Sequence, residues 1–185
     1  MADFMEIIKG RRGVRRYKDL DVSKDDLDTI LEAIRWSPSW SNTQCWEVIV
    51  IKNLETRQDI QGALQGFEAT ATNPAKEALV HAPVLIAICG RLGKSGHYNG
   101  KPTTKFGDWF MFDLGICTQN LCLTAHNLNL ATVIVGLFDH DKVKKILHVP
   151  DGYEVVALVP LGYPAKEARP PKRKEVSEFV HYDRF

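Results

Sequence analysis

The segment from Asp108 to Leu130 constrains the fold more than any other part of the sequence. It is predicted to be helical, and its middle, LGICTQNLCLTAHNL, is apolar on more than one face. A helix of that kind is covered on several sides, so it lies inside a core or an interface. Gly115 costs about 1 kcal/mol relative to alanine within a helix, which indicates close packing of a neighbour at that point.

The rest of the chain alternates between helical and extended patterns. Runs rich in β-branched residues predict strands at 46–51, 84–89, 131–136 and 154–161. Apolar spacing predicts helices at 4–10, 24–36, 54–65, 73–80 and 139–147, with Ser23 and Asp139 as N-caps. Residues 90–107 are rich in Gly, Lys and Thr and are expected to form an exposed loop or lid. This order of elements predicts an α+β fold, a central sheet with helices around it.

The length of 185 residues fits one domain, 1–185. Its last part, 164–185, contains three prolines and a basic run, so it cannot build a core alone. We expect this arm to pack on the body of the domain or on a partner subunit.

Composition excludes several classes of protein. With 24 basic and 23 acidic residues, the chain is not a general polyanion binder, so any anion site is local. No apolar run approaches the roughly 20 residues of a membrane span, and the first nine residues do not look like a secretory signal. The four cysteines form no Cys-x-x-Cys pair, and the six histidines show no ligand spacing. We therefore expect a cytoplasmic protein with reduced, buried thiols, no metal and no membrane partner.

The octapeptide GRRGVRRY at 10–17 gathers four arginines in six positions. Arginine suits phosphate because its planar fork donates two parallel hydrogen bonds and stays charged. Gly13 lets the backbone approach a ligand closely. A phosphate clamp and ion pairing with Asp19, Asp21 and other surface carboxylates are about equally favoured by the spacing. A nucleic-acid patch is less favoured, because the cluster is short. Neither a Walker loop nor a Gly-x-Gly-x-x-Gly fingerprint is present.

Several motifs, in this order, resemble the nitroreductase family of FMN-dependent oxidoreductases over nearly the whole chain. They are RRGVRRY, ILEAIRWSPSWSNTQCW, ATVIVG followed by a capped helix, and LVPLGYP leading into PPKRKEVSEFVHYDRF. The resemblance implies a nitroreductase-like α+β fold with a mixed or antiparallel sheet. It also implies an intertwined homodimer with two FMN molecules at the subunit interface.

The resemblance also implies which residues hold FMN. Arg11 and Arg12, with Arg173 and Lys172 from the arm, would hold the phosphate, and Arg15 would lie near the pyrimidine edge of the flavin. Asn42 would hydrogen-bond the flavin or its ribityl chain. The remaining contacts are backbone or partner contributions: Gly13; Pro38, Ser39 and Trp40 from the other subunit; and Ile134, Val135 and Gly136 near N5. Arg16 has no matching role and is expected in a surface ion pair.

Three positions depart from the family pattern. Gly13 stands where a serine is usual, so one hydroxyl contact is missing. Cys45 replaces the usual proline between Gln44 and Trp46, which makes that loop less rigid. Trp40 is bulky for its position and either narrows the pocket or stacks on the substrate; packing is an equally good explanation.

The implied reaction is ping-pong hydride transfer from NADH or NADPH, through flavin N5, to a nitroaromatic, a quinone or a similar small acceptor. No side chain is assigned as catalytic, because the cofactor carries the chemistry. Two alternatives stay open from the sequence. One is related flavin chemistry such as reductive dehalogenation or flavin fragmentation, and the other is a non-enzymatic basic binding module.

Overall fold

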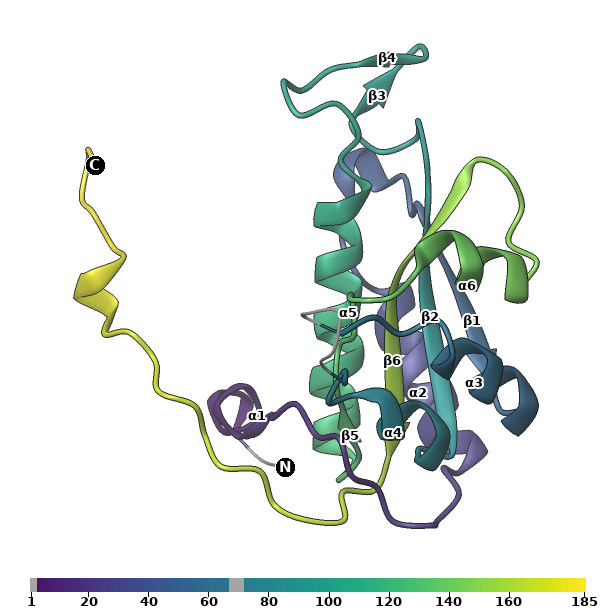
Figure 1. Cartoon of the computed structure of the whole chain (residues 1–185). Coiled ribbons are helices and arrows are strands. Elements are labelled where there is room, and N and C mark those ends of the chain that lie inside the picture. Colours follow the sequence, from purple (N-terminus) through teal and green to yellow (C-terminus); the bar gives the residue numbers. More distant parts are fainter. Residues whose placement is uncertain (1–2, 67–71) are drawn as a thin grey trace.

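In the computed structural model of the chain, residues 3–66 and 72–185 are described. The helices and strands follow the alternation expected from the sequence (Figure 1). The helices are α1 (Phe4–Gly10), α2 (Lys24–Arg35), α3 (Leu54–Gln61), α4 (Lys76–His81), α5 (Phe110–Asn127) and α6 (His140–Ile146). The strands are β1 (Trp46–Ile51), β2 (Val84–Arg91), β3 (His97–Tyr98), β4 (Lys101–Pro102), β5 (Ala131–Thr132) and β6 (Tyr153–Gly162).

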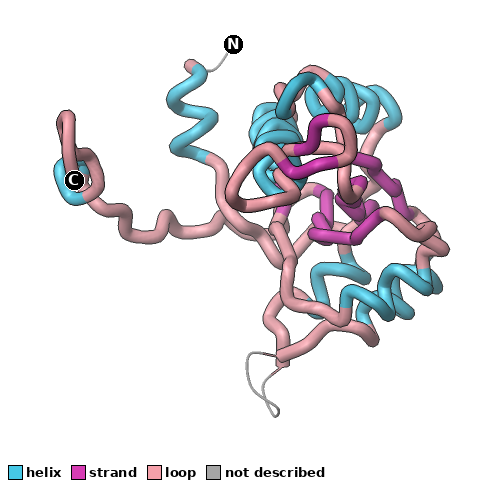
Figure 2. The backbone as a smooth tube through the Cα atoms, turned by 90° about the horizontal axis from the view of Figure 1, so that it is seen from above, coloured by secondary structure: helices cyan, strands magenta, loops and turns pink. Residues whose placement is uncertain are grey.

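Four strands form the central sheet in the order β1-β2-β6-β5, and every neighbouring pair is antiparallel. Helices cover both faces of this sheet, as Figure 2 shows from above. The predicted α+β class with an antiparallel sheet is therefore confirmed.

Strand β2 shows why the molecule has two apolar layers. Successive side chains of a strand point to opposite faces. Leu85, Ala87 and Cys89 join the cluster that includes α3, α4 and α6. Their neighbours Val84, Ile86 and Ile88 join the cluster formed with α2 and α5. The strand is buried on both sides, which explains its continuous apolar run.

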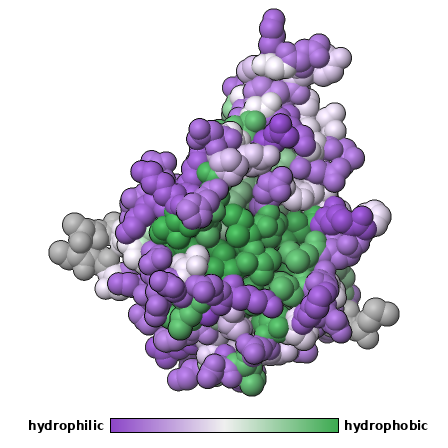
Figure 3. All heavy atoms as spheres, turned by 90° about the vertical axis from the view of Figure 1, so that its right-hand side faces the viewer, coloured by the Kyte–Doolittle hydropathy of each residue, from purple (hydrophilic) through white to green (hydrophobic). Residues whose placement is uncertain are grey.

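The side of the molecule that carries α3, α6 and β1 is apolar at its centre (Figure 3). Partly buried side chains here pack against the first cluster, among them Ile49, Leu64 and Ile146. β1 is the outermost strand on this side of the sheet, next to β2 alone.

Side-chain caps fix the starts of three helices. Ser23 Oγ accepts a hydrogen bond from the Asp26 amide at 3.0 Å, and Asp139 caps α6 through the Lys142 amide at 2.9 Å. Both caps were predicted. Asn53 caps α3 through the Thr56 amide at 2.8 Å. Such caps stabilise a helix by about 1 kcal/mol each, because they satisfy amides that have no partner within the helix.

One expectation for local structure was wrong, and a second was right about exposure but missed the paired backbone. The predicted strand 131–136 ends at Thr132; Val135 pairs with Leu158 as an isolated bridge, and Ile134 and Gly136 are exposed. The predicted loop 90–107 begins with the end of β2 and contains the β3–β4 hairpin, which projects beyond the N-terminal end of α5 (Figure 1). In the first segment, pairing with the distant strand β6 decides the outcome, whereas β3 and β4 pair with each other across the short turn at Asn99 and Gly100.

Helix α1 and the C-terminal arm extend away from the body (Figure 2). No residue of α1 is buried, and the arm is exposed from residue 169 to residue 185 except at Val180. Apolar side chains on the arm face solvent in this single chain, including Phe179, Tyr182 and Phe185.

Candidate functional site

The arginine segment lies between strand β5 and the chain that follows β6. The Val14 amide donates to the Thr132 carbonyl at 2.9 Å, and the Lys18 amide donates to the Tyr163 carbonyl at 2.8 Å. Val14 and Tyr17 are buried, and burial raises the pKa of the Tyr17 hydroxyl. This anchoring fixes the backbone from which the arginines project.

The guanidinium groups of the segment have no carboxylate partners among residues 3–66 and 72–185. The ion pairs considered with Asp19 and Asp21 are therefore absent from the described part of the chain. Arg16 was expected in a surface ion pair, and it also has no such partner among those residues, so this prediction is wrong. Its carbonyl instead accepts from the Ala165 amide at 2.9 Å, which holds the segment against the chain after β6.

Arg12 shows most clearly that the segment has spare donors. Its Nη1 donates to the Lys9 carbonyl and to the Arg11 carbonyl, the latter at 2.8 Å. Its Nε is buried and finds no hydrogen-bond partner among residues 3–66 and 72–185. A buried donor without a partner costs about 1–3 kcal/mol, so an added acceptor here would be stabilising.

A pocket of about 570 Å³ opens beside these arginines. Basic groups outnumber the single acidic side chain in its lining. The lining includes Arg11, Arg12, Lys18, Lys166, Glu167, His126, Cys122, Thr132 and Tyr163. Of the residues predicted to contact FMN, only Arg11 and Arg12 belong to this lining.

His126 is a pocket residue that the sequence analysis did not single out. Burial, with the charges of Arg11 and then Arg12, lowers the pKa of its imidazole. The only signal in the sequence was its place near the end of a predicted helix. Its proximity to the arginines depends on how α1 meets α5.

The segment Ile134–Gly136 offers accessible backbone close to the arginine segment in the fold. Val135 is buried and exchanges two backbone hydrogen bonds with Leu158, both at 2.9 Å. Ile134 and Gly136 on either side are exposed, and a Cβ on Gly136 would meet nothing within 4 Å. Gly13 lies across from Thr132, just before this segment. A flat ligand could lie against such a surface.

The loop containing Pro38, Ser39, Trp40 and Asn42 lies away from the arginine pocket. The Trp40 amide donates to Asp113 Oδ1, in the first turn of α5, at 3.0 Å. The arginine segment instead lies near the end of this helix, where Arg11 and His126 line one pocket. A helix of 18 residues is about 27 Å long at roughly 1.5 Å per residue. Within one chain the two groups of predicted FMN contacts are therefore far apart.

Lys172 and Arg173 lie on the exposed arm, outside the lining of the arginine pocket. Arg15 is exposed on the arginine segment. The structure of one chain thus places Arg11 and Arg12 on one pocket and leaves Arg15, Lys172 and Arg173 outside its lining.

The four cysteines are buried and unpaired, as expected. Burial is the main cause that raises the pKa of Cys45 and Cys89 to about 11 and that of Cys117 to about 12. Burial also raises the pKa of Cys122. At neutral pH these groups are thiols, so they are poor nucleophiles.

The arginine pocket fits the phosphate end of FMN. It offers unpaired guanidinium charge, a buried Nε that lacks an acceptor and further lysine side chains at its wall. A dianionic phosphate would supply acceptors for these donors.

The described residues include no helix long and apolar enough to cross a membrane.

The model of the "Nitroreductase family" matches residues 8–163 of the chain. The "Putative NADH dehydrogenase/NAD(P)H nitroreductase" of Methanothermobacter thermautotrophicus is 29% identical over 168 residues, which span 89% of this chain and 78% of that protein. A nitroreductase family protein of Clostridium difficile has a solved structure with a TM-score of 0.81 and 28% identity, and the match covers 100% of both chains.

A further solved structure is that of oxidised iodotyrosine deiodinase bound to FMN and 3-iodo-L-tyrosine. It has a TM-score of 0.82 at 20% identity and covers 99% of this chain and 100% of that one. At this identity the similarity shows a shared fold.

Proposed function

The chain belongs to the nitroreductase family, and on this premise we propose that it is an FMN-dependent oxidoreductase. It would use NADH or NADPH to reduce a nitroaromatic, a quinone or a similar small acceptor. The observation that carries the proposal is the set of unpaired arginine donors on the pocket beside β5, in a chain that matches the family over residues 8–163. The names of related proteins, which include NAD(P)H nitroreductases, support the same activity.

Each group of residues has a role in this proposal. Arg11 and Arg12 would hold the phosphate, and Arg15 would lie near the pyrimidine edge of the flavin. The exposed residues Ile134 and Gly136, on either side of the buried Val135, would support the ring. When bound, FMN supplies the two-electron chemistry, and the protein supplies its position and electrostatics. We assign no side chain as general acid, base or nucleophile.

A homodimer would complete the site. In one chain, Trp40 and Arg11 lie toward opposite ends of α5. If two copies of α5 pack antiparallel about a two-fold axis, the first turn of one helix meets the last turn of the other. Residues 38–42 of the partner would then approach the arginine segment, as the resemblance implies.

The exposed side of α5 supports such packing. It presents Met111, Phe112, Gly115 and Ile116, and Met111 and Phe112 are more than half exposed. A Cβ on Gly115 would meet nothing within 4 Å of this chain. These positions are neighbours on one face of the helix, and a contiguous group of exposed apolar side chains is typical of an interface.

The arm supports the same assembly. It extends beyond the body with Val176, Phe179 and Tyr182 exposed (Figure 1). An extended segment with exposed apolar side chains is stabilised when it packs on another surface, so we propose that 164–185 packs on the partner. Arg173 and Lys172 would reach a phosphate from there. We also retain the predicted cytoplasmic location.

The test is spectroscopic. The purified protein is expected to be yellow and to bleach on anaerobic addition of NADH or NADPH. Colour is expected to return with a nitroaromatic or a quinone. An acceptor set that includes 3-iodo-L-tyrosine separates reduction of nitro groups or quinones from dehalogenation. A protein that takes up no flavin when FMN is added, or flavin that neither nucleotide bleaches, would overturn the proposal.

A further inference from the structure

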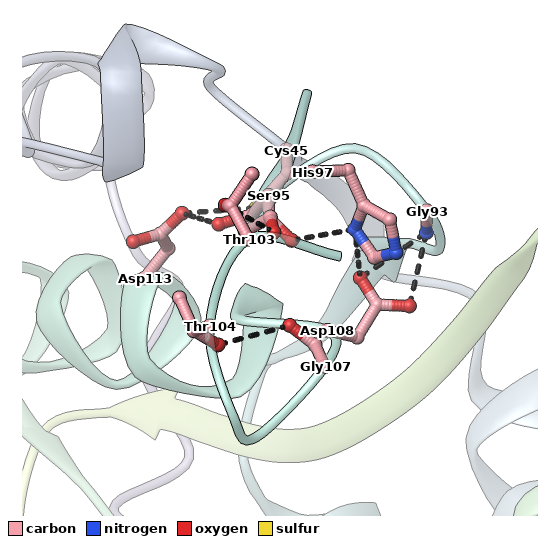
Figure 4. Close-up of polar contacts among 10 residues, drawn as sticks. Cys45, Gly93, Ser95, His97, Thr103, Thr104, Gly107, Asp108 and Asp113 are labelled. Carbon is pink, nitrogen blue, oxygen red and sulfur yellow. Dashed lines mark hydrogen bonds and ion pairs between the residues drawn. The ribbon is translucent and has the colours of Figure 1, made fainter. Parts of the chain in front are cut away.

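Asp113 is a buried carboxylate that accepts hydrogen bonds from three residues (Figure 4 shows the bonds to Ser95 and Cys45). Its side chain is only 1% exposed. Oδ1 accepts from the Trp40 amide at 3.0 Å, and Oδ2 accepts from Ser95 Oγ at 2.6 Å and from Cys45 Sγ at 3.5 Å. The part of the chain that the structure describes offers it no ion-pair partner. Neutral hydrogen-bond donors and the N-terminal turn of α5 therefore stabilise the carboxylate of Asp113.

The donors come from two separate segments. Trp40 and Cys45 begin and end the loop 40–45, whereas Ser95 lies at the base of the segment 92–109, which carries the β3–β4 hairpin. The side chain of Ser95 is fully buried, and its carbonyl accepts from the Trp109 amide at 3.0 Å. One carboxylate thus joins both segments to the start of α5.

The loop needs such support, because its backbone is strained. Ser41, Asn42 and Gln44 have φ values of 49°, 52° and 47°, in the left-handed region. Each such residue costs about 1 kcal/mol or more and persists only where its surroundings fix it. The backbone amide of Gln44 donates to Ser39 Oγ at 2.9 Å, which closes the loop on itself. The bond from Trp40 to Asp113 joins the closed loop to the helix.

The hairpin is also closed on itself (Figure 4). The Gly93 amide donates to both carboxylate oxygens of Asp108, at 3.1 and 3.0 Å. His97 Nδ1 lies 3.6 Å from the same carboxylate, and Thr103 Oγ1 donates to the Gly96 carbonyl at 2.8 Å. A segment held together in this way moves as one body, so the bond between Ser95 and Asp113 fixes its position relative to the loop.

We infer that Asp113 is a positioning residue that fixes the hairpin and the Trp40 loop relative to each other and thereby sets the shape of the acceptor pocket. This inference rests on the proposed function, because that function places residues 38–42 at the flavin. Asp113 itself touches neither cofactor nor substrate in this account. Its effect is on which acceptors fit, because the loop and the hairpin would form adjoining parts of the pocket wall.

The test compares Ser95→Ala and Asp113→Asn with the wild-type, flavin-loaded protein. Ser95→Ala removes the hydroxyl that joins the hairpin to Asp113 and leaves the bond from Trp40 in place. Asp113→Asn keeps an acceptor for the Trp40 amide and removes the charge. The matched control is Thr29→Ala, which removes a hydroxyl that lies outside both segments and donates to the Asp25 carbonyl within α2 at 2.8 Å.

The first measurement is tryptic cleavage of the Lys105–Phe106 bond, identified by fragment mass. Removing a hydrogen bond to a charged group is expected to increase hairpin opening, and so cleavage, about tenfold in Ser95→Ala. Cleavage of Asp113→Asn should also increase, and cleavage of the control Thr29→Ala should match that of wild type. Equal cleavage in all four proteins would overturn the inference. Tryptic cleavage tests whether Asp113 positions the hairpin even if the protein proves not to be a reductase.

The second measurement is the ratio of kcat/KM for a small acceptor, nitrobenzene, to that for a bulky one, menadione. We expect Ser95→Ala to shift this ratio several-fold toward the bulky acceptor at unchanged flavin content. A variant that only loses thermal stability, with the ratio unchanged, would show that Asp113 is structural and would refute a positioning role. Absence of activity in the wild type would instead count against the proposed function.

Discussion

Gly10 lies directly against His126: a Cβ at position 10 would come within 2.5 Å of the imidazole Nε2. This close approach joins the end of α1 to the last part of α5. It also places the imidazole beside the first two arginines of the segment; burial first, and then the charges of Arg11 and Arg12, lower the pKa of His126. The contact between α1 and α5 thus places an imidazole in the lining of the arginine pocket.

The first prediction concerns pH. Because the pKa of His126 is lowered in the folded chain, the unfolded chain takes up a proton first as the pH falls through about 6.5. This group therefore costs stability below that pH. Replacing it, His126→Gln, removes the cost, so the variant should lose less unfolding free energy than wild type on acidification. Urea unfolding of flavin-free protein on both sides of that pH measures the difference. A larger loss in the variant would contradict the lowered pKa.

The second prediction concerns flavin retention. Arg11→Ala and Arg173→Ala should each weaken FMN binding about 10- to 100-fold, because a charge-assisted hydrogen bond contributes roughly 1.5–3 kcal/mol. Titration of apoprotein with FMN, followed by fluorescence quenching, gives the affinity. Arg16→Ala is the matched control, since Arg16 has no assigned role. If Arg11→Ala bound FMN as tightly as wild type, the phosphate assignment would be wrong; if only Arg173→Ala did, the contribution of the arm would be wrong.

The third prediction concerns the proposed dimer. Within one chain, Gly115→Leu should favour the helix by about 1 kcal/mol, because leucine is the better helix former and an added Cβ meets no atom within 4 Å. Against a closely packed copy of α5, the same side chain would clash and promote dissociation. Light scattering after gel filtration distinguishes these effects. Thr29→Leu, on an exposed position of α2, controls for added surface hydrophobicity. Two variants with the same dimeric mass would place the interface away from Gly115.

The fourth prediction concerns the thiols. Because burial raises the pKa of each cysteine, none should react promptly with a disulfide reagent near pH 8 in the native protein. All four should react after unfolding in guanidinium chloride. A spectrophotometric thiol titration counts them. Prompt reaction of one native thiol would show that at least one of these side chains is accessible, contrary to the structure.

The candidate site was only partly accessible from the sequence. The cluster of arginines could be recognised in the sequence, but the groups that these arginines bind could not be predicted from it. Spacing favoured ion pairs with Asp19 and Asp21 as much as a phosphate, and the fold decided against those pairs among the described residues. The assignments on the arm and on the Trp40 loop stay predictions, since they concern a second copy of the chain.

Local patterns by themselves determined most of the helices and strands of this protein, although they predicted too long a strand at 131–136 and missed the hairpin within 90–107. Apolar periodicity and the caps Ser23 and Asp139 are properties of neighbouring residues, so they locate helices and strands without the rest of the chain. The tertiary structure alone decided that Asp113 is buried, that Ile134 is exposed and that His126 meets the arginine segment. Each of these depends on which distant segment packs against that position, and the energy of such a contact is absent from any short stretch of sequence.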